Sequence, residues 1–442
     1  MSEDVTVPRR TTKTLSRVGG DLTVEEATVK AETPDDTVRV EGSTLCYGDC
    51  TFNCSLKTTD LNGRDGEVVI EGDLDAGHHV RIRKGELVVG GNLTSERMEV
   101  DRRVKVSGNL SSDRVKVGGS LRVSEKTKAS QVDVGGSFHS GSDAEVDHID
   151  VGGSVHVDGA TKSNTIDVGG KFEGRGPMQA EKIEVGGSVS CDSDVSIGGV
   201  DVGGRVEVAG GVVKEKVKVG GSFRSSQPLR FSSIDVGGSV RLSGGEGGDI
   251  NVGGTLMSDG DLIFDEIDVG GKVEIRGDAS GRIIEVGGVV RVSKNLSLSE
   301  DMKVGGKAEI GETMKARNMH VGGRLEAEKV EADEEIKTNT LITNQGAKAQ
   351  RVEIGRRGEA QGSIIAGSVL IREWSRVEDI YADSVVLRRD CRARNIYAAR
   401  IDIESGCRIK GEVKYTESLN AEDNVNFASA PEKIEKLPAP PF

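Results

Sequence analysis

The triplet Val-Gly-Gly recurs thirteen times at an almost constant interval, and this repeat constrains the fold more than any other feature of the chain. Nearly every interval is seventeen residues, with one of sixteen and one of eighteen. A fixed period of this length is typical of solenoids, in which each repeat is one structural unit that stacks on the next. Earlier copies lie at Gly19 and Gly90, and the first glycines of the regular copies are Gly118, Gly135, Gly152, Gly169, Gly186, Gly203, Gly220, Gly237, Gly253, Gly270, Gly287, Gly305 and Gly322.

Apolar and polar residues alternate on both sides of each glycine pair. In the copy that spans residues 149–157, Ile149 and Val151 share one face before the glycines, and Val155 and Val157 share one face after them. A period of two indicates half-buried strands rather than helices. The glycine pair is then the corner between two strands, where the chain needs either a positive φ or a close approach of two backbones.

A turn of seventeen residues closes as three short strands and three tight corners. Successive turns would stack about 4.8 Å apart through parallel hydrogen bonds, so that equivalent residues lie on one another. The valine before each glycine pair would form an inward column of side chains, beginning with Val134, Val151 and Val168. We therefore expect an all-β parallel β-helix, a solenoid of over twenty turns and on the order of 100 Å long.

The spacing divides the chain into five segments. The period continues without its glycines after residue 345, with Ile336 to Ile342 as one irregular bridging turn, and prolines should keep the last residues out of the sheet. The expected segments are a disordered arm at 1–15, irregular turns at 16–117 with an insertion near 45–65, the regular coil at 118–345, a second coil at 346–428 and a proline-rich tail at 429–442.

The second coil carries a recognisable series of short motifs. They are Val352-Glu353-Ile354-Gly355, the run from Gly362 to Gly367, the run from Val377 to Ala382, and Gly411-Glu412-Val413. This segment resembles the bactofilin family of polymer-forming cytoskeletal proteins. The resemblance implies a right-handed β-helix, end-to-end polymerisation without nucleotide, and scaffolding work without catalytic residues.

Two features depart from that family. The coil expected here is several times longer than the compact family core. Many members also begin with a short hydrophobic membrane-targeting segment, and Met1 to Arg10 offers none. Membrane attachment is therefore not among the properties that we carry over from the family.

Charge and hydropathy indicate the cellular compartment and exclude some classes of partner. The net charge of −14 is spread along the chain and argues against nucleic acid, which requires a basic face. No apolar run approaches the roughly 18 residues needed to cross a bilayer, and the first ten residues lack the apolar core of a signal peptide. We expect a cytoplasmic protein without a cofactor, and its six cysteines as thiols rather than a disulfide framework.

The turns lack what an enzyme on this scaffold would need. Polysaccharide-acting β-helices use long loops, paired carboxylates and exposed aromatic rings. Here the turns are short and uniform, and three of the few aromatic residues, Phe138, Phe172 and Phe223, occupy the inward position after the glycines. The six-residue beat of left-handed acyltransferase helices is also missing, so we expect no enzyme and no catalytic residues.

Several clusters have a structural and a functional interpretation. His139 and His156 lie one turn apart and should stack on the outside, where Glu173 is the only further metal ligand in view. We expect surface residues there and no metal site. The residue before each column valine is often acidic and could recruit cations, although Lys218 and Lys303 interrupt the row, and a solvated face is the simpler interpretation. The acidic members are Asp133, Asp150, Asp167, Glu184, Asp201, Asp235, Asp268 and Glu285.

The cysteines and the basic residues near the start also have a structural and a functional interpretation. Cys46, Cys50 and Cys54 should be buried small side chains, with His78 or His79 as the fourth ligand if they held a metal. Cys391 and Cys407 should stack one turn apart. A contact with anionic lipid or an acidic partner is the alternative to a solvated arm for the basic start. The basic residues are Arg9, Arg10, Lys13 and Arg17.

The function expected from these features is a structural scaffold that self-associates through the ends of its coil. The open end of a β-helix exposes unpaired strand edges and an apolar cross-section. The alternative is a monomeric spacer or docking surface for partner proteins, and the proline-rich tail could bind such a partner. How well the two ends are capped separates these functions.

Overall fold

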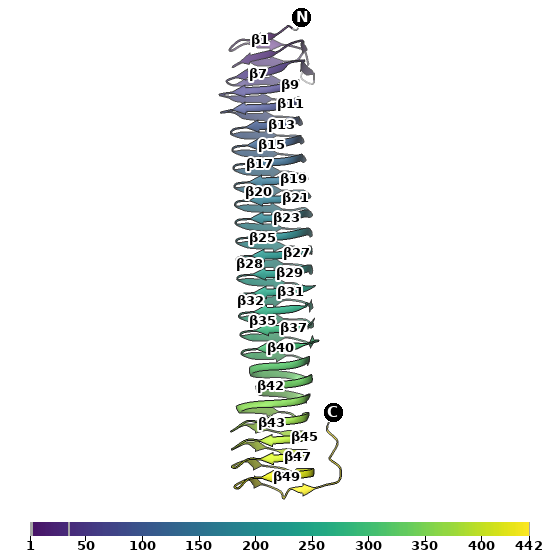
Figure 1. Ribbon diagram of the computed structural model, residues 1–442. Helices are drawn as coiled ribbons and strands as arrows, with labels where there is room; N and C mark the ends of the chain where they lie inside the picture. The colour runs from purple at the N-terminus through teal and green to yellow at the C-terminus, as the bar shows by residue number, and fades with distance from the viewer. Residues whose placement is uncertain (1–2, 34–35, 442) are drawn as a thin grey trace. The chain divides into compact units, whose positions relative to one another are not determined.

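The computed structural model describes residues 3–33 and 36–441, which form strands joined by tight corners. These residues include no helix, and hence none that could cross a membrane. The chain is an all-β parallel β-solenoid of about 25 turns with about 17 residues per turn, which confirms the fold predicted from the repeat. In Figure 1 the strands nearest the viewer run leftward as the chain descends, which is the sense of a right-handed coil.

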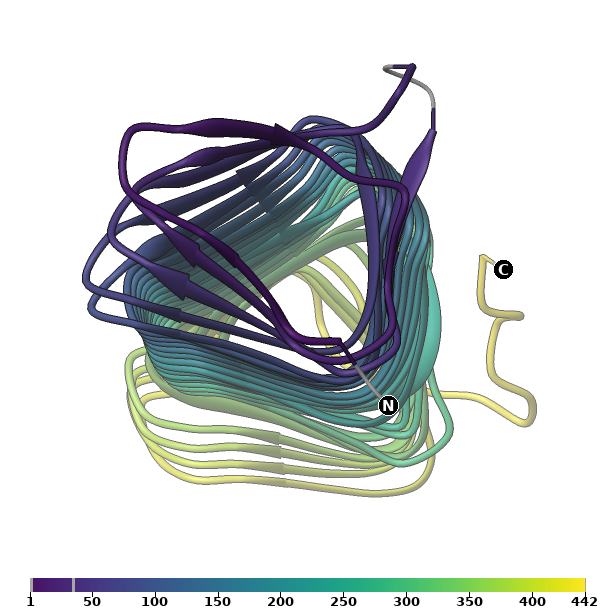
Figure 2. The same cartoon turned by 90° about the horizontal axis from the view of Figure 1, so that it is seen from above.

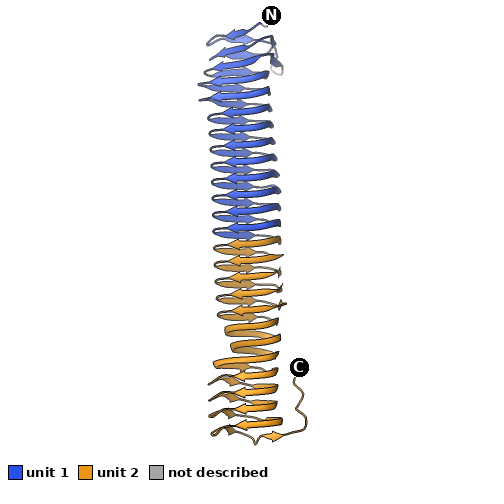
Figure 3. Ribbon diagram, viewed as in Figure 1, with its two compact units in different colours: residues 1–226 blue, residues 227–442 orange. Residues whose placement is uncertain are grey.

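The solenoid divides into two compact units, Met1–Ser226 and Gln227–Phe442, which are coloured separately in Figure 3.

In the regular part of unit 1, each turn has a long strand, a glycine corner and a short strand. Strand β19 (Ala144–Val151) pairs in parallel with β17 (Thr127–Val134) and β21 (Thr161–Val168), and β20 (Ser154–Val157) follows it. Figure 2 shows that each turn has three sides around a narrow interior. The other long strands are β13 (Leu93–Val100), β15 (Leu110–Val117), β23 (Met178–Val185), β25 (Val195–Val202) and β27 (Gly211–Val219), and the other short ones are β14 (Arg103–Val106), β16 (Ser120–Val123), β18 (Ser137–Ser140), β22 (Lys171–Gly174), β24 (Ser188–Cys191), β26 (Arg205–Val208) and β28 (Ser222–Ser225).

Columns of identical or similar side chains fill the interior of unit 1. Val134, Val151 and Val168 are register partners in successive turns, and none is more than 1% exposed. Phe138 and Phe172 are also fully buried, as predicted for the inward position after the glycines. Full burial of one such side chain stabilises the fold by about 1.5–3 kcal/mol. Because every turn adds the same set, the core grows with length and needs no globular interior.

Close backbone approach, rather than a positive φ, explains the glycine corners. A Cβ atom on Gly153 would lie 2.4 Å from the carbonyl oxygen of Gly136, and one on Gly152 would lie 2.5 Å from that of Gly135. The same corner carries a hydrogen bond from the Gly153 N–H to the Gly136 carbonyl at 2.9 Å. None of these four glycines has a positive φ. The sequence left both explanations open, and the structure selects the second.

Unit 2 continues the same plan with fewer glycines toward its end. Strands β34 (Glu266–Val269) and β35 (Lys272–Ile275) pair with β37 (Ile283–Val286) and β38 (Val289–Val292). The predicted bridging turn at Ile336 to Ile342 lies inside one continuous strand, β42 (Thr313–Gln361). The second coil then follows as β43 (Ile364–Ile371), β45 (Asp379–Leu387), β47 (Asn395–Ile403) and β49 (Val413–Ala421), with the short strands β44 (Arg376–Val377), β46 (Arg392–Ala393), β48 (Arg408–Ile409), β50 (Asn426–Phe427) and β51 (Glu432–Lys433).

The disordered arm expected at 1–15 is wrong for its described part. Strand β1 (Val5–Val7) pairs with β4 (Leu22–Glu25), and β2 (Thr12–Thr14) pairs with β5 (Thr28–Lys30). The short basic segment instead forms an ordinary turn of the coil, in which Val7 is completely buried. Residues 1 and 2 lie outside the described part of the chain.

The insertion expected near 45–65 is also misplaced. Residues there form β7 (Ser43–Tyr47), β8 (Cys50–Asn53) and β9 (Ser55–Arg64), all in register with neighbouring turns. The wide turn lies earlier, because Thr14 pairs with Lys30 whereas Arg17 pairs with Arg39. The additional residues therefore fall between Lys30 and Arg39.

Candidate functional site

The last turn of unit 2 exposes apolar side chains at positions whose equivalents one turn earlier are buried. Phe427 is the register partner of Ile409, and Leu419 is the partner of Ile401. Ile409 and Ile401 are 2% and 0% exposed, whereas Phe427 and Leu419 are only half-buried. Val425 lies one turn after the buried Cys407, in the column of side chains next to the one that contains Phe427. It is half-buried as well. We call Leu419, Val425 and Phe427 the carboxy-terminal face.

Unpaired strand edges surround this face. Among the described residues, strand β50 pairs with β48 alone, and β51 pairs with the first part of β49 alone, at Lys414 and Tyr415. In the described chain, the second half of β49 therefore offers its outer N–H and C=O groups to solvent. An edge of this kind is a template for pairing with another chain.

The proline-rich tail joins the sheet briefly and then leaves it. Glu432 and Lys433 form β51, and the Ile434 N–H donates to the Tyr415 carbonyl at 2.9 Å, so the prediction that the prolines exclude this segment from the sheet is wrong for these residues. The described residues beyond Ile434 form no strand. Figures 1 and 2 both show them running beside the coil of unit 2 rather than across its end.

The apolar side chains Val7 and Val18 in the first turn of unit 1 are more deeply buried than those of the carboxy-terminal face. Val7 and Val18 are 0% and 1% exposed, although they belong to the first strands of the coil. Lys13 stands in register with the buried Val29, so a charged side chain begins that column. Charged residues at inward positions of terminal strands discourage edge-to-edge association. Arg9 and Arg17 of the basic start are paired with Glu26 and Glu41 at 3.6 and 2.9 Å.

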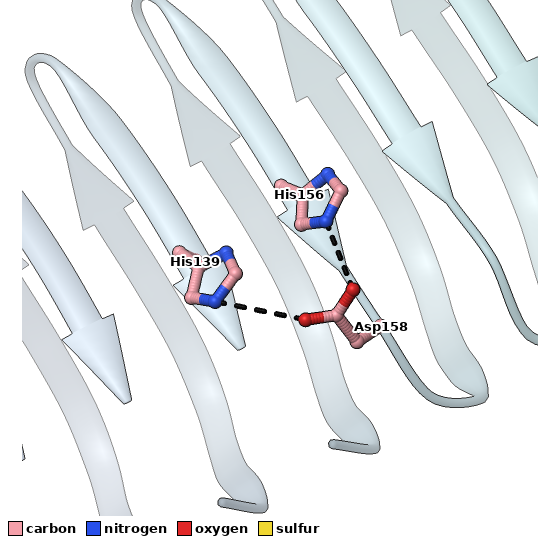
Figure 4. Close-up of side chains that lie close together, drawn as sticks. All are labelled: His139, His156 and Asp158. Carbon is pink, nitrogen blue, oxygen red and sulfur yellow. Dashed lines mark hydrogen bonds and ion pairs between the residues drawn. The ribbon is translucent and has the colours of Figure 1, made fainter. Parts of the chain in front are cut away.

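A histidine cluster lies on the outer surface of unit 1. The rings of His139 and His156 stack with centroids 5.1 Å apart and planes 5° apart, as predicted from their spacing. One carboxylate oxygen of Asp158 lies 3.7 Å from Nε2 of His139 and the other lies 3.0 Å from Nε2 of His156, and Figure 4 shows one oxygen directed at each ring. Glu173, the ligand considered from sequence, lies 3.3 Å from Nδ1 of His156. Asp158 was missed from the repeat pattern, because it follows the end of β20 at a corner.

Charges around this cluster set its electrostatics. Partial burial lowers the pKa of His139, and the positive charge of Arg122 lowers it further. For Asp158, desolvation works to raise the pKa, but the hydrogen bond from His156 and the charge of Arg175 outweigh it and lower the pKa. The lowered pKa of His139 favours its neutral imidazole, and the lowered pKa of Asp158 favours its ionised carboxylate.

The acidic row does not gather into a cation site. Within residues 3–33 and 36–441, one group of three metal-ligating side chains has its ligand atoms close together, and it contains no member of the row. The interrupting lysines pair with the row instead, Lys218 with Asp201 at 3.4 Å and Lys303 with Glu285 at 2.6 Å. The row is thus a solvated, partly ion-paired face.

The cysteines are core residues. Cys46, Cys50 and Cys54 are at most 1% exposed, as predicted, and Cys391 and Cys407 are buried neighbours in register. His78 and His79 do not approach the thiols as ligands, since their side chains are exposed and lie against Glu96 and Asp60. A hydrogen bond with Cys50 and burial both raise the pKa of Cys46.

Two surface features of unit 2 were missed from sequence. Trp374, the only tryptophan of the chain, is 43% exposed, and the guanidinium of Arg356 lies 4.4 Å from its ring centroid. Arg376, Arg392 and Arg408 form an exposed column, one per turn. Their sixteen-residue spacing was visible, but whether acids flank them depends on side-chain placement.

Comparisons with known proteins do not place the chain in a family. No family model, no curated protein and no solved structure matches it. The fold and the local geometry therefore carry the functional argument.

Proposed function

We propose that this protein is a non-catalytic scaffold that self-associates through the carboxy-terminal face of its coil. The observation that carries the proposal is the half-exposure of Leu419, Val425 and Phe427 at positions whose register neighbours are fully buried. Association would remove this apolar surface from water, and it would pair the free edges of β49 and β50.

The resemblance of the second coil to bactofilins supports the same function. That family assembles without nucleotide, and the proposal extends this property to a much longer coil. The burial of Phe138, Phe172 and Phe223 supports a structural rather than a carbohydrate-processing function, because these rings cannot stack on a sugar. The buried thiols suit the cytoplasm, where the proposal places the protein.

A monomeric spacer is the second candidate. Lys13 favours it, because a charged inward residue and the buried Val7 and Val18 make the first turn a poor surface for stacking. Association would then stop at pairs formed through the carboxy-terminal face, or would not occur at all.

Sedimentation velocity and negative-stain electron microscopy of the full chain, without nucleotide, test the proposal. We expect species larger than one chain that increase with protein concentration. Phe427→Lys should shift the protein to single chains. Ile263→Lys is the matched control, because Ile263 is 51% exposed on the side of the coil and the same charge there should leave association unchanged.

A wild-type protein that stays a single chain at every concentration would overturn the proposal in favour of the spacer. Equal association by the wild type and Phe427→Lys would show that another surface is responsible. Circular dichroism of both variants establishes that the coil is intact.

A further inference from the structure

The histidine cluster on unit 1 has the composition and the spacing of a transition-metal site. The two imidazoles come from neighbouring strands, β18 and β20, and Asp158 follows β20 directly. Their ligand atoms all lie within 4.8 Å of one another. We propose that His139, His156 and Asp158 bind a divalent transition-metal ion, with zinc as the reference ion, through both Nε2 atoms and one carboxylate oxygen.

The distances fit a tetrahedral ion after small side-chain movements. Zinc–nitrogen and zinc–oxygen bonds of about 2.0–2.2 Å place tetrahedral ligand atoms about 3.3 Å apart. Nε2 of His156 lies 3.0 Å from one Asp158 oxygen and Nε2 of His139 lies 3.7 Å from the other, so the two separations lie on either side of that value. Because the two ring planes are only 5° apart, the imidazoles must rotate before both Nε2 lone pairs can point at one ion beside Asp158. Water or a donor from another molecule would complete the coordination.

The surrounding structure holds the ligands in place. His139 and His156 are register partners of adjacent turns, and their side chains are 27% and 26% exposed. Glu173 lies 3.3 Å from Nδ1 of His156 and can accept its N–H. When a metal displaces the proton that Nε2 shares with Asp158 at 3.0 Å, a proton on Nδ1 that donates to Glu173 leaves the Nε2 lone pair for the metal, which is the arrangement that metal-binding histidines use.

The donor set also selects the ion. Two imidazoles and one carboxylate favour zinc, cobalt, nickel or copper, whereas calcium and magnesium prefer sites made of oxygen alone. His78, His79 and His320 each lie beside a single acid, and no second histidine shares that acid. Among the described histidines, the pairing around one carboxylate is therefore particular to His139 and His156.

Two arginines weaken the site. Arg175 forms an ion pair with Asp158, and Arg122 is the register partner of His139 on the preceding turn. A bound cation would compete with Arg175 for the Asp158 carboxylate and would be repelled by both guanidinium groups. We therefore expect weaker binding than at a closed four-ligand site, and tighter binding once Arg175 is neutralised.

Titration of the full-length protein with zinc chloride by isothermal calorimetry tests the site, together with the visible spectrum of the cobalt-loaded protein. The wild type should bind one equivalent. His156→Asn and Asp158→Asn should each weaken binding about tenfold or more. His320→Asn is the matched control and should bind as the wild type does.

Arg175→Gln separates a metal site from a merely structural cluster. It should tighten zinc binding severalfold, an effect that loss of structure would not produce. Unchanged affinity in His156→Asn, or no saturable binding by the wild type, would overturn the proposal. Thiolate-to-cobalt charge-transfer bands would overturn it as well, because they would place the ion on the cysteines. None of these outcomes depends on whether the chain self-associates.

Discussion

Lys13 and Val29 are direct register partners in β2 and β5, so an ammonium group begins a column of inward side chains that continues with the buried Val29 and Phe52. At the other end of the chain, the column that contains Ile409 ends in Phe427. One terminal turn thus presents a charge at an inward position, and the other presents an aromatic ring. The coil has the same architecture at both ends, but the chemistry of its last exposed positions differs.

We expect Lys13→Val to promote self-association through the amino-terminal turn. The substitution removes the charge and extends the apolar column formed by Val29 and Phe52. Light scattering at increasing protein concentration should show a larger mean mass than for the wild type. Lys30→Val is the control, since Lys30 is exposed like Lys13 but occupies an outward position in the next turn, and it should have no effect. Equal behaviour of the two variants would contradict a capping role for Lys13.

The glycine corners predict a sharp difference between two Gly→Ala substitutions. Gly153→Ala places a methyl group 2.4 Å from the backbone oxygen of Gly136, so the two turns must separate, at a cost of about 2–3 kcal/mol. At Gly199 the nearest atom would be the flexible carboxylate of Glu215, at 3.3 Å. Gly199→Ala should therefore be neutral or slightly stabilising.

Hydrogen–deuterium exchange is the suitable measurement, because a long solenoid need not unfold as one cooperative unit. Gly153→Ala should lower protection in the strands that flank the corner, and Gly199→Ala should leave protection unchanged. Similar loss in both variants would mean that the glycines are needed for chain flexibility rather than for close approach.

Much of the fold could be predicted because parallel stacking turns a sequence period directly into spatial contact. Val151 and Val168, or His139 and His156, are neighbours simply because they stand one turn apart. Asp158 could not be placed in this way. Its contact with His139 crosses a corner, where the period does not determine which way the side chain points.

The terminal turns were harder to predict for a related reason. The period shows which residues belong to a column, but it does not show which member is last. That Phe427 ends a column, or that the wide turn lies between Lys30 and Arg39 rather than near Cys50, follows only from the pairing of strands. Whether a column residue is buried or exposed therefore depends on whether another turn of the coil covers it.

The arginine column of unit 2 predicts a stabilising charge reversal. Arg376, Arg392 and Arg408 are successive register partners, and no ion pair is found for any of them in the described chain. Like charges on directly paired residues destabilise a sheet by a few tenths to about 1 kcal/mol. Arg392→Glu would place a carboxylate between two guanidinium groups and should raise the thermal midpoint.

Circular dichroism at low and high salt measures this effect. The gain should shrink as salt screens the charges. Arg400→Glu is the control, because Arg400 already pairs with Glu417 at 2.9 Å, and reversing its charge should lower the midpoint. A lower thermal midpoint for Arg392→Glu would show that groups other than the register partners already neutralise the positive charges of the arginine column.

Cys191 predicts a specific loss of stability at alkaline pH. Its thiol is 3% exposed, and burial raises its pKa from the usual 9.0 to about 12. The folded state thus retains the thiol proton between pH 9 and pH 12, whereas the unfolded chain releases it. Because the folded pKa is raised, the stabilisation is complete below pH 9 and declines above it, by about 1.4 kcal/mol per pH unit.

Urea unfolding of the wild type and Cys191→Ala, followed from pH 8 to pH 11, tests this expectation. The variant should be less stable at pH 8 because the cavity costs packing energy, but its midpoint should fall less steeply as the pH rises. Val189→Ala creates a cavity in the same strand and keeps the thiol, so it should retain the wild-type slope. Parallel slopes for the wild type and Cys191→Ala would mean that the thiol ionises without unfolding the turn, and that the interior of the coil admits water at Cys191.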